Sequence, residues 1–131
     1  MIEKITYNET VIALIIYKNY KQDGIKFFSS QEDSLQLGYM ARPKGYQISP
    51  HIHKPVHRNT TGTQEVLFIK SGVIRVNFYS FDKVYLKSRE LNEGDIILLA
   101  GAGHSFEFLE DGEIVEVKNG PFIEGADKER F

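Results

Sequence analysis

Two histidines, His51 and His53, are the residues of this sequence best suited to binding a metal ion. In an extended strand, side chains at positions i and i+2 point to the same face, about 6–7 Å apart. Neutral imidazole nitrogens are good ligands for divalent transition metals, so the pair offers two ligands to one ion. Such a pair also occurs by chance on protein surfaces, so the prediction of a metal site depends on further ligands.

Two further candidate ligands follow downstream, a carboxylate at Glu65 and an imidazole at His104. Glu65 alternates with Leu67 in one predicted strand, and His104 alternates with Phe106 and Phe108 in another, whose aromatic rings we expect in the core. Residues that alternate with core residues share their inward face. The predicted metal ligands are therefore His51, His53, Glu65 and His104. Three imidazoles and a carboxylate suit Fe, Mn, Ni, Zn, Co or Cu, and they leave coordination positions open for water or substrate.

Short β-strands are the elements expected to position these residues. The aliphatic, β-branched run at 11–17 predicts a strand that is buried on both faces or lies in a subunit interface. The sequence shows no helical periodicity over three turns or more, so it predicts an all-β barrel or sandwich. The other predicted strands are 25–28, 35–40, the histidine segment 46–53, 64–70, 73–79, 84–87, 96–99, 104–108 and 113–118. Residues 1–10 are polar and mixed, and the tail from 119 to 131 is expected to wrap over the outside.

Composition narrows the class of protein. A chain of 131 residues predicts a single domain over 1–131. The net charge of −2 gives no electrostatic support for a nucleic acid or an anionic membrane as partner. The absence of cysteine excludes disulfides, thiolate ligands and a cysteine nucleophile. We see no cationic leader and no apolar run long enough to span a bilayer, and therefore expect a cytoplasmic protein.

The spacing of glycines around the four ligands resembles the two motifs of the cupin family. In the first motif, five residues lie between a glycine and His-x-His, and six residues lie between a glutamate and a second glycine. The matching residues here are Gly45, His51, His53, Glu65 and Gly72. Gly94-Asp95 and His104 match the second motif. The chain departs from the pattern in its eleven-residue spacer between His53 and Glu65, which is much shorter in the family. It also has Ala100–Gly103 in place of a proline reversal, and Phe108 where the family has asparagine.

The resemblance covers residues 45–108 and implies a cupin double-stranded β-helix, that is, a jelly-roll barrel. It implies a divalent transition metal in the barrel mouth and often a homodimer. The stretches 63–72, 101–108 and 116–122 also resemble small single-domain bacterial cupins associated with polysaccharide or nucleotide-sugar biosynthesis. Such proteins mostly have no assigned reaction.

Several nearby residues have two interpretations. His57 could replace Glu65 as a metal ligand if the long spacer folds inward, although a loop position is the simpler expectation. Arg58 could clamp a carboxylate or phosphate of a substrate, or be solvated in the loop. Glu116 could reach the cavity, although we expect it on a solvated face. Tyr39 and Tyr46 could act as acids in a pocket, but tyrosines in strands more often serve packing.

Three functions fit this sequence. The first is a metal-dependent enzyme, such as an isomerase, epimerase or dioxygenase, acting on a sugar or nucleotide-sugar derivative, in which Glu65 could serve as catalytic base. The second is a metal-independent sugar isomerase or epimerase with a histidine base and a tyrosine acid. The third is a non-catalytic module that binds or senses a small ligand. One barrel fold hosts many chemistries, so the fold does not choose among them.

Overall fold

The computed structural model describes residues 1–131 and contains only β-strands and the segments that connect them. The strands are β1 (Ile2–Tyr7), β2 (Thr10–Ile16), β3 (Gly24–Phe27), β4 (Gly38–Ala41), β5 (Glu65–Ser71), β6 (Val73–Tyr79), β7 (Tyr85–Asn92), β8 (Ile96–Leu99), β9 (Gly103–Phe108) and β10 (Glu113–Lys118). The predicted all-β class is confirmed. None of the segments forms an apolar helix of bilayer-spanning length.

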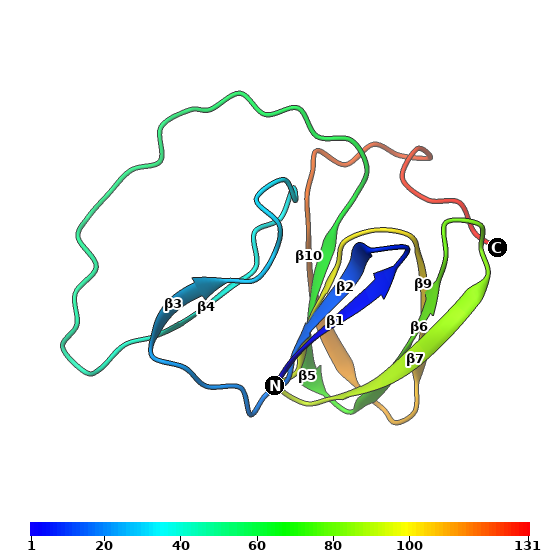
Figure 1. Ribbon diagram of the computed structural model, residues 1–131, viewed down its shortest axis with the longest axis horizontal. Coiled ribbons are helices and arrows are strands. Elements are labelled where there is room, and N and C mark those ends of the chain that lie inside the picture. Colours follow the sequence, from blue (N-terminus) through cyan, green and yellow to red (C-terminus); the bar gives the residue numbers. More distant parts are fainter.

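Two antiparallel sheets face each other and form a sandwich (Figure 1). The larger sheet has five strands in the order β1-β2-β8-β5-β10, and the smaller has three in the order β7-β6-β9. No hydrogen-bonded strand pair joins the two sheets, so they do not close into a barrel. Strands β3 and β4 pair only with each other, and they lie beside the sandwich.

The core lies between the two sheets because apolar residues alternate along the strands that face each other. In β6, Ile74, Val76 and Phe78 are buried while the intervening residues are partly exposed, as the period of two in the sequence predicts. These side chains pack against Leu67 of β5 and Ile97 of β8 from the opposite sheet. This packing holds the two sheets against each other.

Strand β2 is buried on both of its faces, which confirms one of the two alternatives given for residues 11–17. Its outward side chains, Leu14 and Ile16, are buried under residues that come from the segment between β2 and β4. The covering residues include Tyr20, Phe28 and Leu35. The continuous apolar run therefore needs no second subunit to cover it.

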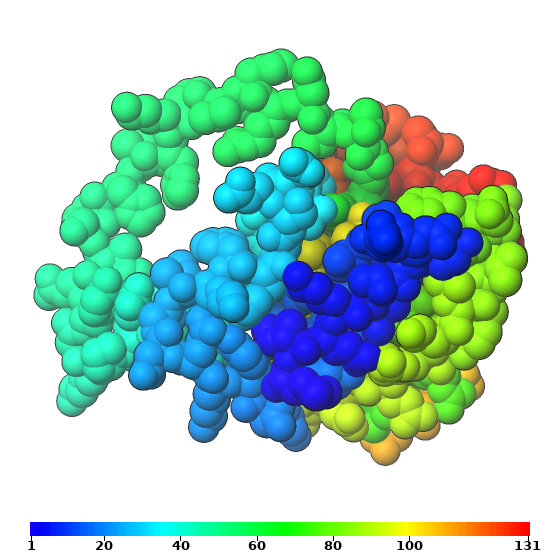
Figure 2. All heavy atoms as spheres, in the orientation of Figure 1, coloured from blue at the N-terminus to red at the C-terminus, as the bar shows by residue number.

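Residues 42–63, which we call the arm, contain no strand, so the predicted histidine strand at 46–53 is wrong for this structure. Every residue of the arm is exposed. The ribbon arcs away from β4 and returns at β5 (Figure 1), and the space-filling view shows a gap between the arm and the β3–β4 pair (Figure 2). A strand needs hydrogen bonds to a neighbouring edge, and here no edge lies alongside the arm.

Other boundaries also differ from the prediction, and the strand expected at 84–87 extends to Asn92 as β7. Residues 2–7 form β1, although their mixed polarity suggested no strand, because an edge strand needs to bury only one position well, here Ile5. Strand β4 begins at Gly38 rather than at 35, since Leu35 and Leu37 instead pack over the outer face of the larger sheet.

A candidate acid–base and metal site between the sheets

Glu65 is a buried carboxylate at the start of β5. It alternates with Leu67 and Ile69, both buried, and so it faces the interior as expected. Its neighbours across the sheet are Leu99 of β8 and Lys118 of β10. Only 8% of Glu65 is exposed, and a carboxylate so buried requires polar partners.

His104 supplies the first of these partners from the opposite sheet. It lies on β9 directly across from the core residue Phe78 of β6, so its ring points toward the larger sheet. Its Nε2 is 3.1 Å from Oε2 of Glu65. The structure thus brings together two of the four predicted ligands, and we call them the inter-sheet pair.

Glu116 is the third ionisable group in this place. It lies on β10 opposite Leu67, which places its side chain on the same inward face as Glu65. The hydrogen bond from His104 is the main reason that the pKa of Glu65 lies below its usual value. Hydrogen bonding to Glu65, together with burial, raises the pKa of Glu116. The two carboxyls therefore ionise in separate steps, with Glu65 first and Glu116 at higher pH.

His51 and His53 lie on the arm and do not reach the inter-sheet pair. Their ring centroids are 5.3 Å apart, and Nδ1 of His51 is 2.8 Å from the carbonyl oxygen of Ser49. His57, the rival ligand, is also exposed on the arm, where its Nε2 is 3.1 Å from Oδ1 of Asn59. No group of three histidine or acidic side chains is assembled closely enough to hold a metal ion.

The four predicted ligands nevertheless carry the nitrogen and oxygen donors that suit a transition metal. They lie in two separate pairs, which would be the two halves of such a site. The 3.1 Å between Nε2 of His104 and Oε2 of Glu65 is a hydrogen-bond distance, and two ligands of one ion lie at a similar separation. On the arm, the adjacent rings of His51 and His53 form the other half. These residues fit a transition metal if the two halves meet.

The aromatic residues next to His104 are less buried than expected. Phe106 and Phe108 follow His104 on its face of β9, but they are 37% and 52% exposed. Strand β9 is an edge of its sheet, so no strand lies on its other side. The prediction that both rings lie in the core is wrong, and the sandwich is open along this side.

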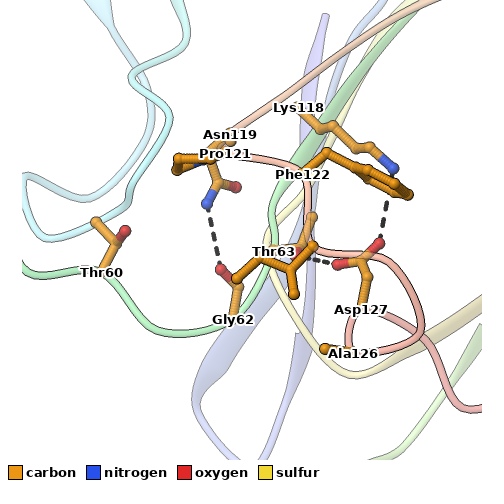
Figure 3. A pocket seen from close by; sticks show the side chains of 11 residues that line it. Thr60, Gly62, Thr63, Lys118, Asn119, Pro121, Phe122, Ala126 and Asp127 are labelled. Carbon is orange, nitrogen blue, oxygen red and sulfur yellow. Dashed lines mark hydrogen bonds and ion pairs between the residues drawn. The ribbon is translucent and has the colours of Figure 1, made fainter.

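A pocket of about 420 Å³ lies next to the site, between the base of the arm and the C-terminal tail (Figure 3). Lys118, the strand neighbour of Glu65, forms part of its wall. Nζ of Lys118 is 3.6 Å from Oδ2 of Asp127. The remaining lining residues are Thr60, Gly62, Thr63, Asn119, Gly120, Pro121, Phe122, Ile123 and Ala126.

Both interpretations of Glu116 hold in part, because its side chain is exposed and also contacts Glu65. The sequence pattern does not single out Lys118 or Asp127. The alternation of Glu116 with Ile114 was the available signal, but alternation does not say which strand lies alongside. The register of β10 against β5 decides that Glu116 meets Glu65. Asp127 belongs to the tail without strands, where no pattern marks its position.

Comparison with known proteins identifies no family for this chain. No protein-family model matches the sequence, and neither curated proteins nor solved structures show significant similarity to it. The resemblance to cupins depends on the motif residues alone.

Proposed function

We propose that this protein is a small cupin that binds a divalent transition metal and a small molecule beside it, at a site completed when the arm closes on the inter-sheet pair. The contact between Glu65 and His104 is the observation that carries the proposal. It joins two residues 39 positions apart in sequence, one from each sheet, and brings a nitrogen and an oxygen donor to one place.

The open edge of β9 supports closure of the arm. Phe106 and Phe108 are exposed on this side of the sandwich. If residues 46–53 paired with the free edge of β9 with His51 and His53 facing Glu65, the added strand would cover part of these rings, and burial of apolar surface favours such pairing. Tyr46, Ile48 and Ile52 would then lie on the alternate face of that strand and point away from the site. The added strand would convert the open sandwich toward the double-stranded β-helix of a cupin.

Charge supports the same movement. No aspartate or glutamate occurs between residues 34 and 64, and the arm carries the cations Arg42, Lys44, Lys54 and Arg58. The chain as a whole has a net charge of −2, so the rest of the molecule is acidic. Glu65 and Glu116 lie at the place where the arm would dock. Opposite charges on the two surfaces favour the closed arrangement.

Each residue of the completed site has a distinct role. His51, His53, Glu65 and His104 would hold the metal, which supplies Lewis-acid or redox chemistry when it is bound. Before metal binds, the raised pKa of Glu116 lets its carboxyl keep a proton at a pH where Glu65 is already ionised. We propose a sugar or nucleotide-sugar derivative as the small molecule, and polysaccharide biosynthesis as its setting. We also propose a homodimer, as the resemblance to cupins implies.

Metal analysis tests this proposal directly. We expect the purified protein to bind one equivalent of Ni²⁺ or Mn²⁺ in calorimetric titration at neutral pH. Loss of a ligand in His53→Ala, Glu65→Gln or His104→Ala should weaken binding by more than about tenfold. His57→Ala is the matched control, because it removes a histidine of the same arm and should leave the affinity unchanged.

Two results would contradict the proposed ligand set. If His104→Ala binds metal as tightly as the native protein, the arm histidines act alone and the two halves do not meet. If His57→Ala loses metal while Glu65→Gln retains it, His57 is the ligand and Glu65 is free. Circular dichroism of each variant checks that the fold is retained.

A second candidate is acid–base catalysis without a metal, as in a sugar isomerase or epimerase. The separated pKa values of Glu65 and Glu116 favour it, because a proton donor and a proton acceptor side by side are typical of such sites. The same titration distinguishes the two functions. A protein that binds no metal at equimolar concentration supports the metal-free mechanism.

A further inference from the structure

The pocket between the base of the arm and the tail is lined mainly by polar side chains. Its wall contains hydroxyl, amide and carboxylate side chains together with one aromatic ring, that of Phe122, which is 74% exposed. At about 420 Å³ it falls within the range of roughly 300–1,000 Å³ that small-molecule sites occupy.

Hydrogen bonds fix this pocket independently of the rest of the arm. Asn119 donates from Nδ2 to the carbonyl of Gly62 and accepts at Oδ1 from the amide of Gln64, at 3.2 and 2.8 Å. The hydroxyl of Thr63 donates to Oδ1 of Asp127. Figure 3 shows the contacts of Asn119 with Gly62 and of Thr63 with Asp127 joining the two sides of the pocket. The pocket would therefore keep its shape while residues further along the arm move.

The polar groups that remain free define the ligand. Asp127 accepts one hydrogen bond at Oδ1 and an ion pair at Oδ2, which leaves lone pairs on both oxygens. Lys118 can donate further hydrogen bonds from its ammonium group, and the hydroxyl of Thr60 makes no side-chain hydrogen bond (Figure 3). Both donors and acceptors thus face a small volume, beside an exposed aromatic ring.

The charges of the pocket select a neutral ligand. Lys118 and Asp127 are its only ionisable residues, and they pair with each other at 3.6 Å. Their charges cancel, so the pocket offers no surplus positive charge to a phosphate. A ligand that matches it has several hydroxyls and one face of C–H groups to lie against Phe122.

We propose that this pocket binds a neutral pyranose, a monosaccharide or one sugar unit of a larger molecule. Lys118 links the pocket to the candidate site, because its Cα is the direct strand partner of Glu65. A sugar held there would lie beside the inter-sheet pair. The inference rests on the proposed function only for the reaction of the bound sugar. The binding of sugar to the pocket does not depend on it.

Titration of the ¹⁵N-labelled full chain with D-glucose and D-galactose, followed by NMR and with EDTA present, tests the inference. We expect saturable shifts of the amides at 60–63 and 118–127, with a Kd in the millimolar range. Phe122→Ala should weaken binding about tenfold by removing the aromatic surface. Phe27→Ala, which removes another exposed ring, that of β3, should leave the Kd unchanged.

The inference is overturned if neither hexose shifts these amides, or if inorganic phosphate shifts them and the hexoses do not. Equal effects of Phe122→Ala and Phe27→Ala would also refute it. Because EDTA removes metal during this titration, the result for sugar binding does not depend on whether the protein binds metal. If the protein binds metal but no hexose, the proposed metal-binding function stands and sugar binding in this pocket is refuted.

Discussion

At the scale of single residues, Glu116 controls the electrostatics around the inter-sheet pair. Its carboxyl competes with His104 for Glu65, and its pKa is raised while that of Glu65 is lowered. Once Glu116 has ionised, two carboxylates lie close together and repel each other. The native protein is therefore less stable above the pKa of Glu116 than it would be with a neutral group there.

Replacement of Glu116 by Gln should stabilise the protein at pH 7, because an amide can donate a hydrogen bond to Glu65 without adding charge. Glu116 is largely exposed and screened by solvent, so we expect a gain of only about 0.5 kcal/mol. A pKa raised by folding gives stability at low pH that is lost as the pH rises through that pKa. The gain should therefore vanish below the pKa of Glu116, where the native carboxyl is protonated.

Urea unfolding at several pH values between 4 and 8 measures this gain. Glu110→Gln, at an exposed glutamate outside the ion pairs, serves as the control and should change stability little at any pH. A loss of stability in Glu116→Gln at pH 7, or a gain that does not depend on pH, would show that the carboxyls of Glu65 and Glu116 are not coupled.

The sequence predicts part of this residue-scale geometry. Alternation with Leu67 correctly orients Glu65 toward the interior, and alternation with Phe106 does the same for His104. It does not predict the exposure of Phe106, because exposure depends on which strand covers the edge. It also leaves open whether Glu116 reaches the site from its exposed position, because the register between β5 and β10 is a long-range property.

At the scale of elements, an ion pair joins the two sheets along the side away from the candidate site. Glu3 of β1 accepts hydrogen bonds from Nε and Nη2 of Arg89 on β7, at 3.0 and 2.7 Å, and from the hydroxyl of Tyr17 at 2.8 Å. Arg89 is the main cause of the lowered pKa of Glu3, whereas burial and Glu3 raise the pKa of Tyr17 to about 12. The two sheets are therefore joined on the side of β1 and β7, whereas the side with β9 and β10 is open.

Glu3→Gln should lower the free energy of unfolding at pH 7 by about 1–2 kcal/mol, because it weakens a partly buried, charge-assisted network. A pKa lowered by folding gives stability above the unfolded value near 4.5, and that stability is lost as the pH falls through the folded value. The difference between Glu3→Gln and the native protein should therefore shrink in acid.

Chemical denaturation at pH 7 and pH 3 measures both effects. Glu107→Gln provides the comparison, because Glu107 pairs with Arg75 at 3.2 Å on the exposed face and should contribute less than about 0.5 kcal/mol. Equal losses for the two variants would mean that the ion pair between β1 and β7 is no stronger than a surface pair.

Elements differ in how far the sequence determines them. The run at 11–17 and the alternation of 73–79 predict β2 and β6 correctly, since burial on both faces or on one face leaves a direct pattern. Strand β1 leaves little pattern because it lies at an edge. Segment 46–53 has the alternation of a strand but no partner in the structure, and alternation can specify faces without specifying a partner.

At the scale of the whole molecule, the sandwich, its open side and the arm are the parts that the proposed closure would bring together. Glu65 and His104 lie in contact between the sheets, and β9 has a free edge. The arm, which carries two histidines and four cations, arcs away from the sandwich in the structure. Closure with His51 and His53 facing inward would bring the four predicted ligands together beside the aromatic rings of β9.

Anomalous diffraction from crystals grown with Ni²⁺, recorded at the nickel absorption edge, measures the ligands of the bound ion most directly. We predict one strong peak per chain, about 2.0–2.2 Å from a nitrogen of His51, His53 and His104 and from a carboxylate oxygen of Glu65. A peak bound by the arm histidines alone, with Glu65 and His104 still paired to each other, would contradict closure of the arm onto the site.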